Sequence, residues 1–134
     1  MVVKKIQLHF ADFMVREDEI LHAHIYENTH LDSHKARELF EVMEQHVFLE
    51  KHLMLISLER NVKITRDAMA FSASNHSTKY SIAEAYVSSH PFHRFLSTIY
   101  LHFHEPEVPT KFFPAISNAI EWLHQFNTTQ IKLT

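Results

Sequence analysis

The sequence predicts an α/β domain with a mixed sheet of four to five strands, an antiparallel hairpin at its start and about four flanking helices. Three observations lead to this class. Apolar and polar residues alternate in parts of residues 6–26, a continuous apolar run at 53–58 and a short strand at 82–87 follow, and segments with helical apolar spacing separate these strands. Because strands that alternate with helices are joined by right-handed crossovers, the later strands are expected to be parallel.

The N-terminal strands are predicted from period-two alternation. Residues 6–10 alternate apolar with polar side chains, which is typical of a half-buried strand. Residues 13–16 and 20–26 form the predicted hairpin around a polar turn at 17–18. The run at 53–58 lacks alternation, as expected for a parallel strand that is covered on both faces.

Four segments carry helix signals. Asp32 and Thr65 are good N-caps for a first helix and for a second helix at 66–74. Pro91 and Pro114 open a third and a fourth helix, because the first helical turn tolerates proline. The inward residues predicted for the first, third and fourth helices are Ala36, Leu39, Phe40, Met43 and Val47; Phe92, Phe95, Leu96, Ile99 and Phe103; and Ile116, Ala119, Ile120 and Leu123.

The 134 residues predict one domain over 1–134, with its core at about 5–126 and a frayed tail at 127–134. The start of the chain has no apolar signal region. The longest uncharged apolar run, 53–58, is far shorter than the roughly 20 residues of a membrane helix. We therefore expect a cytoplasmic protein that does not insert into membranes.

Composition excludes several classes of function. The chain has no cysteine, which excludes disulfides and thiolate metal sites, and no glycine, which excludes phosphate-binding loops and dinucleotide fingerprints. The formal net charge is −3 and the basic residues are scattered, which argues against nucleic-acid binding. No cofactor is expected. Left-handed backbone positions must fall to other residues, namely Asp18, Asn28, Asn61 and Asn75.

Four segments carry a resemblance to a known group. They are VKITRDA at 62–68, AYVSS at 85–89, EPEVPTKFF at 105–113 and AIEWL at 119–123. In these segments the chain resembles bacterial STAS-like proteins, which are related to the anti-sigma factor antagonists and to the CRAL-TRIO lipid-exchange domains. The resemblance covers about residues 12–126, and none of its motifs is catalytic.

The resemblance implies a STAS-like fold and a regulatory or protein-interaction role. In the anti-sigma factor antagonists, a serine in an Asp-Ser-Ser-Gly turn after the third strand is phosphorylated. The corresponding turn here, residues 64–68, has no Ser-Ser-Gly, and its nearest hydroxyl belongs to Thr65. Because this chain lacks the Ser-Ser-Gly motif, the resemblance does not imply that it has the phosphorylation switch of that family.

The helix starts form the candidate ligand site. In open α/β sheets, ligands bind beyond the carboxyl ends of the parallel strands, where helix N-termini offer free amides and partial positive charge. With right-handed crossovers, three helix starts share this edge, which predicts binding of a small anion, a phosphoryl group or a partner's carboxylate. Ordinary helix capping explains the same hydroxyls without a ligand. The candidate ligand-binding residues are Ser33, Thr65, Arg66, Ser88, Ser89, His90 and Arg94.

Two other features, a pair of histidines and a lone glutamate, are candidates for chemistry. His22 and His24 point to one face of a strand about 7 Å apart, but no third metal ligand is visible, so no metal site is predicted. Glu84 interrupts an otherwise apolar strand. Either it is a buried carboxyl with a raised pKa and a functional role, or it lies on an edge strand or in a salt bridge.

Two classes of function remain open. The first is a non-enzymatic regulatory or interaction module that binds a protein partner, or a second copy of the chain, at the helix-start edge. The second is a carrier for a small molecule or a lipid, with a pocket between sheet and helices lined by Phe92, Phe95 and Phe112. An enzyme ranks third, because the sequence shows no base–nucleophile pair and no pair of carboxylates, so no catalytic residue is named.

Overall fold

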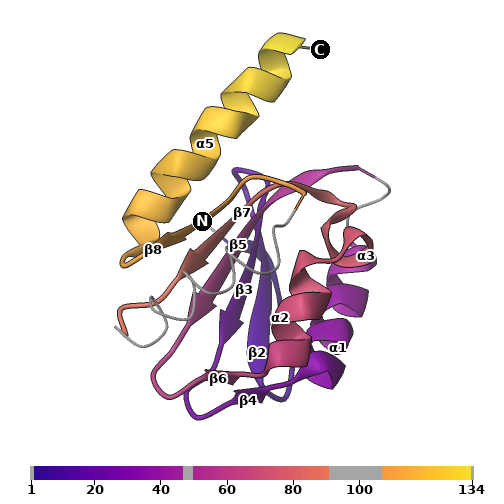
Figure 1. The fold of residues 1–134 in the computed structure, drawn as a ribbon. Helices are drawn as coiled ribbons and strands as arrows, with labels where there is room; N and C mark the ends of the chain where they lie inside the picture. Colours follow the sequence, from indigo (N-terminus) through magenta and orange to yellow (C-terminus); the bar gives the residue numbers. More distant parts are fainter. Residues whose placement is uncertain (1, 47–49, 91–106, 134) are drawn as a thin grey trace.

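The computed structural model describes residues 2–46, 50–90 and 107–133. Its main element is a sheet of six strands in the order β1-β2-β3-β5-β7-β8 (Figure 1). Neighbouring strands are antiparallel from β1 to β3 and parallel from β3 to β8, as the sequence predicts. The strands are β1 (Val2–Gln7), β2 (Ala11–Arg16), β3 (Ile20–Ile25), β5 (His52–Leu58), β7 (Ser81–Val87) and β8 (Thr110–Phe113).

The predicted count of four to five strands is wrong by one, because β8 was missed. This strand has only four residues, and it pairs in parallel with β7 so that Tyr86 lies opposite Phe112. A strand that short has too little pattern to be recognised from its own residues. The alternation at 6–10 also misplaced a boundary, since β1 ends at Gln7 and Leu8 N–H donates to the Ala11 carbonyl in the turn to β2.

The first two helices begin where their caps predict, whereas the helix predicted to open at Pro114 begins two residues later, at Ile116. Asp32 caps α1 (Ser33–Glu44) by accepting a hydrogen bond from the Lys35 amide, and Thr65 caps α2 (Arg66–Ala73) in the same way. The short α3 (Asn75–Thr78) follows, and α5 (Ile116–Leu133) runs through the segment for which a frayed tail was predicted. The predicted helix after Pro91 and its inward residues, Arg94 among them, lie outside the described residues, as does Val47.

The two faces of the sheet are covered by different helices. Helices α1 and α2 pack on one face, and α5 lies over the other (Figure 1). On β5, Met54 contributes to the α1 and α2 side, whereas Leu53 and Leu55 pack with Leu123 of α5. Burial on both faces explains the continuous apolar run of this strand. Ile116, predicted to face inward, is instead 39% exposed, because it stands at the start of α5 before the helix reaches the sheet.

Two asparagine turns bring the helix starts together. Asn28 and Asn61 adopt left-handed backbone conformations, with φ of 63° and 60°, and their side chains are joined by a 3.1 Å hydrogen bond. Both were predicted for such positions. The third left-handed residue is Glu19 in place of Asp18, and Asn75 belongs to α3. Beyond these turns, β4 (His30–Leu31) pairs in parallel with β6 (Lys63–Ile64).

None of the helices that the structure describes is both long enough and apolar enough to cross a membrane.

Candidate functional site

The starts of α1 and α2 form one surface, which we call the helix-start edge. The Thr65 amide donates to the Leu31 carbonyl at 3.1 Å, which extends the β4–β6 pairing up to both helices. Ser33, the first residue of α1, hydrogen-bonds the Asp67 carboxylate in the first turn of α2. The structure therefore brings together Ser33, Thr65 and Arg66 from the predicted site.

Side chains of the chain itself already accept hydrogen bonds from the free backbone amides at this edge. The Lys35 amide donates to Asp32 at 2.9 Å, and the Ala68 amide donates to Thr65 Oγ1 at 3.2 Å and to Asp67 at 3.0 Å. The Lys35 amide lowers the pKa of Asp32, and hydrogen bonds from Thr65 and then Ser33 lower the pKa of Asp67. These bonds satisfy the partial positive charge that an external anion would have used.

The third predicted helix start lies farther along the same edge of the sheet. Ser88 directly follows β7 and is buried, and its amide donates to the Phe113 carbonyl of β8 at 3.1 Å. The Ser88 hydroxyl accepts a hydrogen bond from the His90 amide at 3.2 Å, while Ser89 and His90 are exposed. Among the described residues, no hydrogen bond is found between this group and Ser33 or Thr65. The predicted binding of an anion across all three starts stays a prediction.

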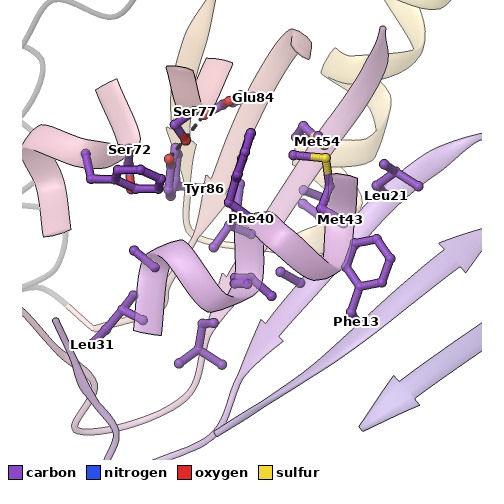
Figure 2. A pocket seen from close by; sticks show the side chains of 17 residues that line it. Phe13, Leu21, Leu31, Phe40, Met43, Met54, Ser72, Ser77, Glu84 and Tyr86 are labelled. Atoms are coloured by element: carbon purple, nitrogen blue, oxygen red, sulfur yellow. Dashed lines mark hydrogen bonds between the residues drawn. The ribbon is translucent and has the colours of Figure 1, made fainter. Parts of the chain in front are cut away.

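A pocket of about 100 Å³ lies between the sheet and the helices α1 and α2. Strands β2, β3, β5 and β7 supply one wall, α1, α2 and α3 supply the other, and Leu31 of β4 adds to the lining. Figure 2 shows that the polar and apolar lining residues are separated. The polar residues Ser72, Ser77, Glu84 and Tyr86 lie at one end, and the rest of the lining is apolar. The site therefore combines an apolar body with a few convergent polar groups, as small-molecule sites do.

Glu84 is the ionisable group at the polar end of this pocket. It is 5% exposed, and its carboxyl oxygens accept hydrogen bonds from Ser81 Oγ at 2.7 Å and from Tyr86 Oη at 3.2 Å. Burial raises the pKa of Glu84 to about 7, because the charged form loses its hydration. Its neighbours are hydroxyls, and no basic side chain of the described residues pairs with it.

The structure rules out one of the alternatives that the sequence left open for Glu84 and confirms the predicted burial, while its functional role stays a prediction. The strand β7 lies between β5 and β8, so the interpretation as an edge strand is wrong. The alternation of β7 explains the placement of the side chain. Ala83 and Ala85 pack toward α5, and Glu84 therefore points to the opposite face, toward the pocket.

A second polar cluster lies on the face of the sheet that α5 partly covers. His22 Nε2 and His24 Nδ1 both lie 2.7 Å from Ser57 Oγ, and His24 Nε2 lies 2.5 Å from Glu59 Oε2. Burial and the neighbouring His24 lower the pKa of His22 to about 4. The sequence placed the two histidines on one face, but Ser57 and Glu59 were missed, since they come from another strand and its following turn.

Neither cluster has the form of a metal centre. In the part of the chain that the structure describes, no group of three or more histidine, cysteine, aspartate or glutamate side chains is placed to hold a metal ion. The aromatic lining predicted for a carrier pocket is also different. Phe112 stacks on Tyr86 with ring centroids 4.9 Å apart, while Phe92 and Phe95 lie outside the described residues.

The fold and the pocket define a mixed α/β domain with a small apolar site under α1 and α2. The chain belongs to a family of domains of unknown function, DUF7793, whose model matches residues 13–127. It is similar to a protein of unknown function from Arthrobacter sp. FB24, known from a crystal structure. The identity is 22% over 83% of this chain and 90% of that chain, with a TM-score of 0.32. No curated protein matches the chain.

Proposed function

We propose that this domain is a non-enzymatic regulatory module that binds a small molecule in the pocket under α1 and α2. The observation that carries the proposal is Glu84, a carboxyl buried at the end of an apolar pocket, whose partners among the described residues are hydroxyls. Pockets with convergent polar groups and a perturbed ionisable residue are the usual places for ligand binding.

The energetics of Glu84 support a role other than stability. An ionised carboxylate costs several kcal/mol to bury when no cation compensates it, and an apolar residue of similar size would avoid that cost. The two hydroxyl hydrogen bonds compensate only in part, since the pKa stays near 7 rather than at its ordinary value. Residues that reduce stability in this way are typical of functional sites.

The size of the pocket favours a small ligand over a lipid. A dry protein cavity of roughly 150 Å³ holds benzene, and the pocket here has about 100 Å³. A lipid chain would need several times this volume. The pocket volume therefore favours a small molecule, rather than a lipid, as the ligand of this domain.

The test is a binding screen against the purified domain by amide NMR. Apolar molecules of benzene size or smaller are expected to shift the signals of Leu21, Phe40 and Phe71, which line the pocket. Ala36→Leu should abolish these shifts by filling the pocket from α1, whereas Ala115→Leu, at an exposed position before α5, should not. Screening hits that bind the Ala36→Leu variant unchanged would contradict the proposal.

A second candidate function is binding of a protein partner at the helix-start edge. The contact between Ser33 and Asp67 favours it, because it joins the starts of the two helices in one surface on which Arg66 and Asp67 are exposed. The resemblance to STAS-like proteins supports the same use. Leu31 and Ala36 line the pocket from β4 and the first turns of α1, so a partner at this edge would sense whether the pocket is filled.

Charge reversal tests this second candidate. Arg66→Glu changes an exposed side chain at the helix-start edge, and Lys4→Glu makes the same change on the distant edge strand β1. Crosslinking in the cells that naturally make the protein should yield a complex that Arg66→Glu loses and Lys4→Glu keeps. Equal yields from both variants would argue against this edge.

A further inference from the structure

We infer that the pocket takes a small molecule with an ammonium group on an apolar body, and that Glu84 is the counter-ion of that ammonium. This inference rests on the proposed function, because it names the chemical class of ligand for the same pocket. Three properties of the site carry it: the hydrogen-bonding capacity that Glu84 leaves unused, the lack of a cationic partner for Glu84 among the residues that the structure describes, and the apolar lining of the remaining volume.

The first property is the unused capacity of the carboxyl group. A carboxylate offers about four lone-pair sites, and Glu84 uses two of them, one for Ser81 and one for Tyr86. Both neighbours are donors, so the surroundings are arranged for an acceptor. Buried polar groups normally have their partners, and because Glu84 lines the pocket, a ligand bound there can supply a further donor.

The second property is charge. A bound cation favours the ionised form of a carboxyl group, whereas a bound carboxylate would disfavour it. Burial has already removed the water around Glu84, so a cation that arrives there meets a desolvated and strongly attractive partner. Ser72 and Ser77 lie at the same end of the pocket (Figure 2) and supply hydroxyl oxygens, which are the acceptors that further ammonium hydrogens need.

The third property is the shape of the ligand body. Beyond the polar end, the pocket is bounded by Leu21, Phe40, Met43 and Met54, which offer no strong hydrogen-bonding partner (Figure 2). Its volume of about 100 Å³ suits a short branched alkyl group. The ligand class is therefore a small aliphatic amine, protonated in water and short enough to place its nitrogen at Glu84.

Three probes of matched shape test the class: 3-methylbutylamine, 3-methylbutan-1-ol and 3-methylbutanoic acid. Isothermal titration calorimetry at pH 7 should show that the amine binds at least tenfold more tightly than the alcohol and that the acid does not bind. Because the pKa of Glu84 is about 7, binding of the amine should release about half a proton, measured from buffers with different ionisation enthalpies.

Two further measurements test whether Glu84 causes the preference for the amine over the alcohol. In Glu84→Gln the amine should lose its tenfold advantage while the alcohol binds as before, and Glu121→Gln, an exposed change on α5, should have no effect. The wild-type protein provides a test that needs no variant. Its affinity for the amine should rise about tenfold from pH 6 to pH 8, as Glu84 ionises, with no such rise for the alcohol.

The outcomes separate the inference from the proposed function. If the alcohol binds as tightly as the amine and neither affinity depends on pH, the ammonium inference is overturned while ligand binding in the pocket stands. If neither probe nor any other small apolar molecule shifts the pocket signals, the proposed function fails as well. Tighter binding of the acid than of the amine would overturn the assignment of charge.

Discussion

Ser57 joins two histidines of the neighbouring strand, because its hydroxyl oxygen lies 2.7 Å from both His22 Nε2 and His24 Nδ1. A hydroxyl can donate one hydrogen bond and accept another, so this single group satisfies both rings. Ser57 is 3% exposed, which leaves little room for water to replace it. The parallel pairing of β3 with β5 sets this contact by placing His24 opposite Ser57.

Ser57→Ala should therefore destabilise the fold. Loss of the hydroxyl leaves two ring nitrogens without this partner, and a buried polar group without its hydrogen bond costs about 1–3 kcal/mol. Urea unfolding at pH 7.5 measures the change in the free energy of unfolding. Ser89→Ala, at an exposed position, serves as the control and should change it by less than about 0.5 kcal/mol. Equal values for the two variants would contradict a structural role for Ser57.

Buried His22 should make the fold sensitive to acid. Its folded pKa, about 4, lies below the ordinary value of 6.5, so the folded state binds this proton less readily than the unfolded state. Stability linked to His22 is complete above pH 6.5 and is lost as the pH falls toward 4, by about 3 kcal/mol. Urea unfolding from pH 7.5 to pH 4 should show a steeper loss for the wild type than for His22→Gln. His34→Gln, an exposed change on α1, should follow the wild type.

Glu84→Gln should stabilise the protein in alkaline solution. The folded pKa of about 7 lies above the ordinary 4.5, so ionisation penalises folding as the pH rises through this range and fully above it. The neutral amide keeps one acceptor oxygen for one of the two hydroxyls, and the other hydroxyl can turn to accept a hydrogen bond from the amide NH2. We expect a gain of about 1–3 kcal/mol at pH 8 and almost none at pH 4, measured by urea unfolding. A loss of stability that is the same at both pH values would contradict this account of Glu84.

Thr65→Ala should cost about 1 kcal/mol, because the Ala68 amide at the start of α2 loses an acceptor. The Asp67 carboxylate still accepts from that amide, and the helix should therefore remain formed. Thermal unfolding followed by circular dichroism measures the change. Ser117→Ala, an exposed change near the start of α5, is the comparison. An unchanged melting temperature for Thr65→Ala would show that Asp67 alone is the cap.

Glu19→Gly should stabilise the turn between β2 and β3. Glu19 has a φ of 68°, where a side chain with a Cβ costs roughly 1–2 kcal/mol and glycine does not. The greater freedom of glycine in the unfolded chain reduces the benefit, so the expected gain is about 0.5–1 kcal/mol. Asn28→Gly should gain less, because asparagine tolerates this conformation better than glutamate. Urea unfolding of the two variants compares them directly.

Local patterns in the sequence determined most of the framework. Asp32 and Thr65 were predicted as caps, and both accept hydrogen bonds from amides in the first turn of their helices. The run at 53–58 was predicted as a parallel strand covered on both faces, which β5 is. These features depend on near neighbours in the chain, on backbone preferences and on the period of the apolar pattern, all of which can be read from a single segment.

Only the tertiary structure decided which side chains contact one another across strands. Nothing in the spacing of the residues relates His24 to Ser57, or Tyr86 to Phe112, since these pairs form only when particular strands become neighbours in a particular register. The same holds for Glu84. The sequence identified it as a carboxylate in an apolar strand, but its burial, its hydroxyl partners and the pocket beside it depend on where β7, α2 and α3 pack. A side chain carries its own chemistry, whereas its partners and the polarity of its surroundings come from residues far away in the chain.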